Sequence, residues 1–214
     1  DSLRLATGEA PYVADLKFEG MVHGAMKFSD HPRAKVLKIN TSVAEKLDGV
    51  LRVFTAEDIP GERHTGLIVP DWPLMVKRGE TTRYVGDVLA GVVAETEQIA
   101  REAVALIEVE YDILTPVTDP FAALSAESPK IHESGNLLSN TEIERGDANQ
   151  AEKESAFVTK GTYKTQRIEH AFLEIECCVV KPREDGVEVF SQSQGVYEDR
   201  NSISKILGLP SEKV

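Results

Sequence analysis

Two short stretches of this chain gather residues that could do chemistry. Residues 165–174 (TQRIEHAFLE) place Glu169, His170 and Glu174 among apolar side chains, and residues 191–195 (SQSQG) contain Gln194. Carboxylates, imidazoles and amides are costly to bury without partners. This density therefore predicts either a closed hydrogen-bond network or a ligand, cofactor or partner bound there.

The first stretch has a spacing known from metal sites. His170 and Glu174 are four residues apart, as ligands on one helix face are, with Glu169 as a candidate third ligand. However, residues 175–181 are β-branched and Cys-rich, and no second histidine is near in sequence. We therefore favour a structural hydrogen-bond network and predict no metal ligand. A His/Glu metallohydrolase centred on His170 is the least favoured alternative.

The second stretch offers a sharper candidate. Gln194 lies between a predicted strand that ends at Ser191 and a predicted helix that starts near Asp199, where a turn can project one amide into a cleft. A polar loop residue is usually only solvated, so this position alone does not establish a function. The sequence contains no glycine-rich phosphate loop and no serine nucleophile elbow.

The composition excludes some classes of protein. A net charge of -12 and a pI near 4.9 argue against nucleic-acid binding, because no excess of Lys or Arg is present. No apolar run is long enough to predict a membrane span. The adjacent pair Cys177 and Cys178 is poorly suited to a mutual disulfide, which fits a reducing cytoplasm. Because Asp1 is not Met and the chain stops just after a helix-ending signal, we expect both ends to be cut from a longer protein.

The elements that must position these residues alternate between strand and helix. We expect an α/β (α+β) fold, with helices between the strands, an exposed excursion at residues 61–82 and a linker rich in Pro and Ser that separates a second unit. The predicted strands are 22–28, 35–39, 50–55, 84–94, 108–111, 157–165, 175–181 and 187–191, and the helices are 42–49, 97–107, a short one capped by Asp147 and Gln150, and 199–207. The predicted domains are 1–118 and 141–214, joined by the linker 119–140.

Several segments together resemble a known family. ATGEAPYVADL, HGAMKFSDHPRAKVLKINTS, GVLRVFTAEDIPG, RYVGDVLAGVVAET and VEYDILTPVTDP are similar to the amino-terminal hammerhead domain of the large subunit of molybdenum hydroxylases, the xanthine dehydrogenase and aldehyde oxidase family. GTYKTQRIEHAFLE, FSQSQGVYEDR and ILGLPSEKV resemble the opening of the molybdopterin-binding domain that follows. The resemblance is collinear from about Leu5 to Val214, and it is greatest to bacterial selenium-dependent xanthine dehydrogenases.

The resemblance implies an oxidoreductase. Members of the family place oxygen from water on a carbon of an N-heterocycle, such as a purine, or of an aldehyde, and pass electrons through iron-sulfur clusters to a flavin on partner domains or subunits. It implies that Gln194, with Gly195, contacts the molybdenum cofactor, and that Glu169, His170 and Glu174 form a supporting shell behind it. The remainder of the molybdopterin-binding subunit would be a further partner.

The chain departs from the family pattern at its end. The glycine-rich segment and the distant glutamate base of the family lie beyond Val214, so we expect this chain alone to be inactive and to hold no stable molybdenum. A noncatalytic scaffold that docks redox partners is the alternative from another functional class. The substrate, the use of selenium and the oligomeric state cannot be read from these residues.

Overall fold

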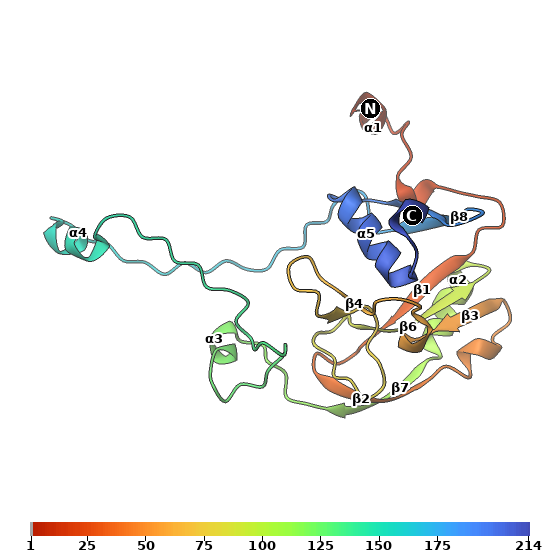
Figure 1. Cartoon of the computed structure of the whole chain (residues 1–214), viewed down its shortest axis with the longest axis horizontal. Helices are drawn as coiled ribbons and strands as arrows, with labels where there is room; N and C mark the ends of the chain where they lie inside the picture. Colours follow the sequence, from red (N-terminus) through yellow and green to blue (C-terminus); the bar gives the residue numbers. More distant parts are fainter. Residues whose placement is uncertain (1) are drawn as a thin grey trace. The chain divides into compact units, whose positions relative to one another are not determined.

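The computed structural model of the protein describes residues 2–214, which divide into two compact units. The first unit comprises Asp1–Pro129 and Glu174–Val214, and the second comprises Lys130–Leu173. Figure 1 follows the chain by colour from the amino-terminal to the carboxy-terminal end. The two parts of the first unit are therefore far apart in sequence but fold together.

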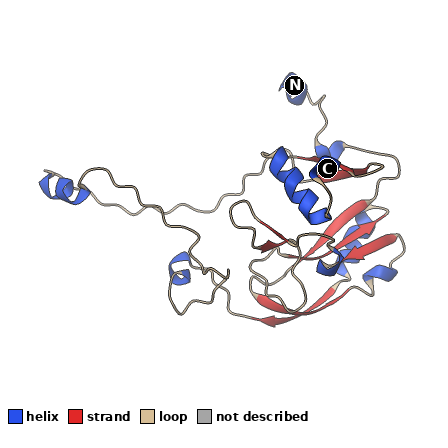
Figure 2. Ribbon diagram, viewed as in Figure 1, coloured by secondary structure: helices blue, strands red, loops and turns tan. Residues whose placement is uncertain are grey.

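All strands belong to the first unit among the described residues, and all of them pair antiparallel (Figure 2). They form one three-stranded sheet in the order β1-β6-β3 and the pairs β2-β7, β4-β5 and β8-β9. Their bounds are β1 His23–Phe28, β2 Ala34–Asn40, β3 Val50–Phe54, β4 His64–Thr65, β5 Trp72–Pro73, β6 Val88–Ala94, β7 Glu108–Ile113, β8 Cys178–Pro182 and β9 Val187–Ser191.

Short helices and turns connect the strands of this unit. The mixture of helices and antiparallel strands confirms the predicted α/β (α+β) fold class. The α-helices are α1 Ser2–Ala6, α2 Glu97–Ala105, α3 Pro120–Ala123 and α5 Val196–Leu207, and the 3-10 turns are η1 Val13–Asp15, η2 Ala44–Lys46, η3 Ala56–Asp58 and η4 Ser211–Lys213. None of the helices between residues 2 and 214 has the length and apolar character needed to span a bilayer.

The core of the first unit lies where α2 packs on β6. Thr96 caps α2 by accepting a hydrogen bond from the backbone N–H of Ile99 at 3.2 Å. The apolar stripe of α2 then buries Ala103 against Val92 of β6. Removing this apolar surface from water is the main favourable contribution to folding here. β6 is consequently the most buried of the strands.

The predicted exposed excursion at residues 61–82 is wrong for its second half. Val76 is fully buried, and Thr82 is 1% exposed. The Thr82 hydroxyl donates to the carbonyl of His31 at 3.0 Å and accepts from the N–H of Ala34 at 2.9 Å. This part of the chain is held against β2 by hydrogen bonds that the irregular sequence does not reveal.

Two predicted elements take another form. The helix predicted over 42–49 shrinks to η2, because the Ser42 side chain bonds to Asn40 rather than forming a capping box with Glu45. The strand predicted over 157–165 is absent. Phe157 is 93% exposed there, and an isolated extended segment has no neighbouring strand to complete its backbone hydrogen bonds.

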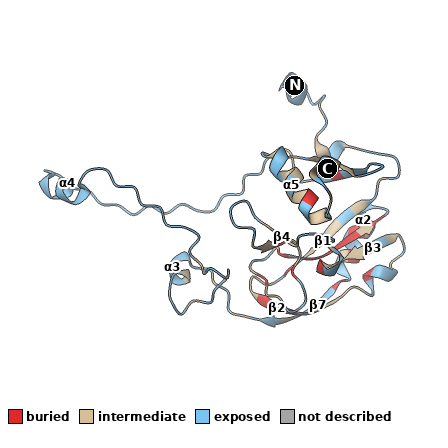
Figure 3. Ribbon diagram, viewed as in Figure 1, coloured by how far each residue is buried: buried red, intermediate tan, exposed pale blue. Residues whose placement is uncertain are grey.

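The second unit contains one helix, α4 (Ala148–Glu154), which Asp147 caps as predicted by accepting from the N–H of Gln150 at 2.8 Å. Gln150 supplies the backbone N–H of this cap bond. No residue between 130 and 173 is buried, as the pale ribbon of Figure 3 shows. This segment therefore has no apolar core of its own.

Helix α5 is tied to the start of the excursion through its carboxy-terminal end. The N–H groups of Gly61 and Glu62 donate to the carbonyls of Ile206 and Lys205 at 2.9 and 3.0 Å. Gly208 then ends α5 in the left-handed conformation (φ +64°). These bonds satisfy carbonyls that a helix end otherwise leaves unpaired.

Candidate functional site

The SQSQG stretch forms the turn between β9 and α5. The hairpin of β8 and β9 is predicted correctly, and its pairing runs from Pro182 opposite Val187 to Cys178 opposite Ser191. The chain leaves the hairpin after Ser191 and enters α5 at Val196. The turn is therefore held between a paired strand and the first turn of a helix.

Gln194 lies at the exposed tip of this turn. Its side chain makes no hydrogen bond or ion pair with any residue between 2 and 214. Next to it, the Gly195 N–H donates to the Ser193 hydroxyl at 3.0 Å, and the Gly195 carbonyl accepts the first backbone bond of α5, from the N–H of Asp199 at 2.9 Å. The turn thus presents one amide whose donor and acceptor are both free for a bound group.

Gly195 lets the Glu198 side chain lie close to the backbone at the start of α5. It occupies the helix N-cap position without a side-chain cap. A Cβ atom at Gly195 would lie 2.3 Å from the Glu198 carboxylate, so any larger residue would push that side chain aside. The N–H groups of the first helical turn have no partners within the helix, which makes this end of α5 a set of hydrogen-bond donors.

Gln192 is a site residue that our sequence analysis did not single out. Its Nε2 donates to the carbonyl of Ile175 at 2.8 Å, while its Oε1 is buried and has no partner among residues 2–214. Beside Ile175, the Glu174 carboxylate accepts from the backbone N–H of Val13 at 3.2 Å. Glu174 and the SQSQG turn are therefore connected through adjacent residues, although they are separate in sequence.

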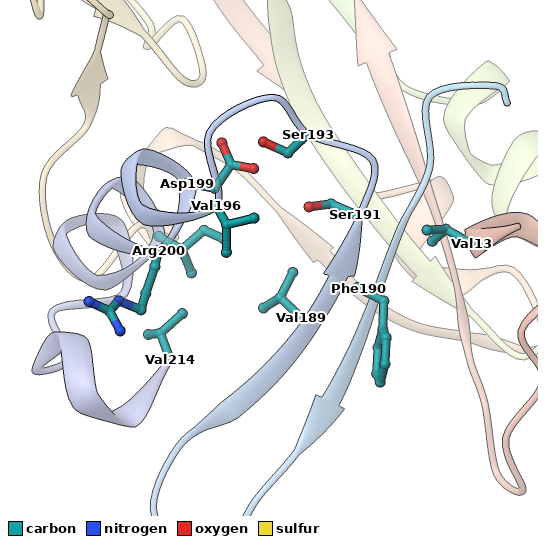
Figure 4. A pocket seen from close by; sticks show the side chains of 10 residues that line it. Val13, Val189, Phe190, Ser191, Ser193, Val196, Asp199, Arg200 and Val214 are labelled. Carbon is teal, nitrogen blue, oxygen red and sulfur yellow. The ribbon is translucent and has the colours of Figure 1, made fainter. Parts of the chain in front are cut away.

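A cavity of about 360 Å³ opens beside the turn, between α5 and β9 (Figure 4). Ser193 and Asp199 lie at the end nearest the turn, and most other lining side chains are apolar. Arg200 also borders the cavity, and its guanidinium lies over the Tyr197 ring at 5.3 Å. The lining residues are Val13, Val189, Phe190, Ser191, Ser193, Val196, Asp199, Arg200, Ile203 and Val214.

The nearby thiol is not an activated nucleophile. Burial raises the pKa of Cys178 above that of a free thiol, and the neighbouring Cys177 and the carboxylate of Asp199 raise it further. A thiol must ionise before it attacks or binds a metal. Covalent cysteine chemistry at this end of β8 is therefore disfavoured near neutral pH.

The two other sequence candidates belong to the second unit. The Glu169 carboxylate accepts from the N–H of Ala171 at 3.4 Å, and the His170 ring lies 6.3 Å from that of Phe172. No helix forms over 165–174, so His170 and Glu174 do not share a helix face. Among the described residues, no three His, Cys, Asp or Glu side chains are grouped to hold a metal ion, and the metallohydrolase alternative is not favoured.

Comparison with known proteins gives two family matches in chain order. Residues 7–115 match the domain described as aldehyde oxidase and xanthine dehydrogenase, a/b hammerhead domain. Residues 131–214 match the molybdopterin cofactor-binding domain. Gln194 and Gly195 fall within the second match, as do Glu169, His170 and Glu174.

Individual relatives agree with these matches. A probable xanthine dehydrogenase subunit of Bacillus subtilis (strain 168) is 37% identical over 97% of this chain and 28% of its own length. The nicotinate dehydrogenase large molybdopterin subunit of Eubacterium barkeri is 33% identical over all of this chain and 50% of its own length. The chain thus spans half or less of these two relatives.

Solved structures share the fold. Quinoline 2-oxidoreductase from Pseudomonas putida 86 aligns with a TM-score of 0.85 and 29% identity over 99% of this chain and 28% of that one. Aldehyde oxidoreductase from Desulfovibrio gigas also gives a TM-score of 0.85, and its 23% identity over 99% of this chain and 25% of that one speaks for the fold alone. Since the hammerhead match alone covers half of the chain and the cofactor-binding match follows it, the chain belongs to the aldehyde oxidase and xanthine dehydrogenase family, as a stretch of a molybdenum hydroxylase large subunit.

Proposed function

We propose that this chain is part of the catalytic subunit of a molybdenum hydroxylase that oxidises an N-heterocycle, with Gln194 as its residue nearest to the chemistry. The observation that carries the proposal is the unpaired Gln194 amide at the tip of the turn before α5, within the segment similar to molybdopterin-binding domains. The names of the relatives, which act on xanthine, nicotinate and quinoline, support a heterocycle ahead of an aldehyde.

The groups at this turn fit an oxygen-bearing face of the cofactor. The Gln194 amide and the first N–H groups of α5 are donors. The buried Oε1 of Gln192 supplies one acceptor for a donor group. Glu198 and Asp199 in the first turn of α5 would disfavour a phosphate group at this end of the helix.

When bound, the molybdenum cofactor would supply the two-electron redox centre and the activation of water. Gln194 would donate an N–H to an oxygen of the bound cofactor and so stabilise negative charge on that oxygen. A neutral amide stabilises this charge without releasing a proton, and it does not titrate between acid and alkaline pH. We propose that Gly195, in the same turn, would also contact the cofactor.

The remaining roles are supporting ones. We propose that Glu174 fixes the segment behind the turn through its bond to Val13, and that Glu169 and His170 belong to the same supporting shell once the subunit is complete. We keep 1–118 as the hammerhead domain, 119–140 as linker and 141–214 as the start of the cofactor domain. Iron-sulfur and flavin partners would accept the electrons, in a cytoplasmic enzyme consistent with the free Cys177 and Cys178.

The test uses the complete subunit and its partners. We expect stoichiometric molybdenum by elemental analysis, and incorporation of ¹⁸O from labelled water into xanthine, nicotinate or quinoline. Gln194→Ala should retain the metal and lower kcat about 10²- to 10³-fold, as removal of one charge-stabilising donor does elsewhere. Gln98→Ala, on the exposed face of α2, is the matched control.

Two outcomes would contradict the proposal. A complete subunit without molybdenum would support the scaffold that docks redox partners, and full activity in the Gln194→Ala variant would remove the assigned role. We also expect the 214-residue chain alone to bind no stoichiometric molybdenum and to show no turnover, because the relatives that carry these activities are at least twice as long.

A further inference from the structure

The ladder of the β8–β9 hairpin ends one residue before Gln192. Ser191 is the last residue of β9 that pairs with β8, opposite Cys178. Beyond it, the turn is held at its far end by the start of α5 at Val196. The position of Gln194 therefore depends on what holds residues 192–194 in between.

One side-chain bond holds this part of the turn to another segment of the described chain. The Gln192 Nε2 donates to the Ile175 carbonyl at 2.8 Å. The other side-chain bond of the turn, from the Gly195 N–H to the Ser193 hydroxyl, is internal to it. Releasing the Ile175 bond would thus free the turn without breaking the hairpin or the helix.

The segment that receives this bond is itself held in place. Ile175 follows Glu174, whose carboxylate accepts from the N–H of Val13 in η1. Phe18, just beyond η1, packs on Phe190 of β9 with ring centroids 5.9 Å apart. The Ile175 carbonyl therefore belongs to a segment that is held in place, so a hydrogen bond to it can fix the position of the turn.

We propose that Gln192 is a positioning residue that fixes the orientation of Gln194 by tethering the turn to the Ile175 carbonyl. The inference rests on the proposed function of Gln194, but the tether can be measured in the 214-residue chain without any metal. Gln192 acts through Gln194 and is not assigned a contact with the reacting atoms.

The first test compares Gln192→Met with Gln98→Met by NMR and amide exchange. Both variants remove a side-chain donor at nearly constant length, but Gln98 bonds only to Glu102 on the surface of α2. A net hydrogen bond of ordinary strength predicts exchange of the Gly195 amide about two- to tenfold faster in Gln192→Met, with shifted side-chain resonances of Gln194. Unchanged exchange and resonances at both residues would overturn the proposal.

The second test uses Gln192→Glu, so that the inference does not depend on one variant. An ionised carboxylate cannot donate to the Ile175 carbonyl, whereas a protonated one can. The fast exchange of Gly195, measured relative to Gln98→Glu, should therefore return toward that of the original chain as the pH falls below about 4.3. An exchange ratio independent of pH would contradict the tether.

The complete enzyme separates this inference from the function on which it rests. If Gln192 positions Gln194 in this way, the Gln192→Met enzyme should still bind molybdenum, but the spectroscopic signature of the metal should change. Its kcat should fall by a larger factor than its KM rises. If Gln194→Ala leaves the activity of the complete enzyme unchanged while Gln192→Met speeds amide exchange as expected, the proposed function is wrong and the tether is supported. If Gln194→Ala is impaired but the exchange of Gly195 is unaffected by Gln192→Met, only the tether fails.

Discussion

Arg63 and Glu80 form an ion pair within residues 61–82, the segment whose first residues bond to the carboxy-terminal end of α5. The Arg63 guanidinium donates to the Glu80 carboxylate through Nη1 at 3.1 Å and through Nη2 at 2.9 Å, and the Lys77 N–H adds a bond at 2.8 Å. Burial works to raise the pKa of Glu80, but the Lys77 N–H and Arg63 outweigh it and leave this pKa below the usual range. The ionised carboxylate therefore contributes to stability.

Glu80→Gln keeps the shape of the side chain and removes its charge. Hydrogen bonds to a charged group contribute about 1.5–3 kcal/mol, and we reduce this because the Glu80 side chain is 37% exposed. We expect a loss of about 1–2 kcal/mol near neutral pH. With an m value of about 2 kcal/mol/M in urea, the unfolding midpoint should fall by about 0.5–1 M.

The pH dependence of this loss follows from the lowered pKa. A carboxyl group with a lower pKa in the folded state contributes stability above its unfolded pKa, and this contribution disappears as the pH falls through the folded pKa. The difference in the free energy of unfolding between the original chain and Glu80→Gln should thus be largest above about pH 5 and should decrease toward about pH 3. Urea titrations monitored by Trp72 fluorescence at both pH values measure it.

An exposed ion pair provides the control for Glu80→Gln. Glu110→Gln breaks the exposed pair with Lys38, whose side chains are 64% and 57% exposed, and it should change stability by less than about 0.5 kcal/mol. Equal midpoints for Glu80→Gln and the original chain near neutral pH, or a gap that persists unchanged in acid, would refute the reasoning.

Two further predictions concern backbone geometry. Gly61→Ala should destabilise the first unit by about 1–3 kcal/mol in urea unfolding, because its Cβ would lie 1.9 Å from the Lys205 carbonyl, whereas Gly24→Ala, with its nearest contact at 3.9 Å, should have little effect. Equal effects would contradict the close approach. Thr96→Ala should remove the cap of α2 and cost about 1 kcal/mol by the same measurement, whereas Ser42→Ala, which caps no helix, should be nearly neutral.

Local signals explain which elements the sequence predicts well. Helix α2 combines its own cap at Thr96 with an apolar stripe, and α5 ends at Gly208. Both helices can therefore be predicted from residues within or next to them. The strand predicted over 157–165 fails because a strand depends on a partner that local alternation does not identify. The helix predicted at η2 fails because Asn40, just outside it, competes for Ser42.

The residues of the candidate site can be only partly predicted from the sequence, because one of them depends on a contact with a residue distant in sequence. Gln194 is found because it lies between two predictable elements, β9 and α5. Gln192 differs from it by two positions and has the same side chain, yet one is tethered and the other is free. Their difference depends on Ile175, which is distant in sequence, and no spacing rule connects these residues.

The division of the chain into units has an entropic consequence. Pro129 and Glu174 both belong to the first unit, so Lys130–Leu173 forms a closed loop on a folded body. The entropy of closing a flexible loop changes by only about 0.6 kcal/mol for each doubling of its length. The first unit should therefore tolerate large changes in the length of this loop, so its stability places little constraint on how long the segment between residues 130 and 173 is.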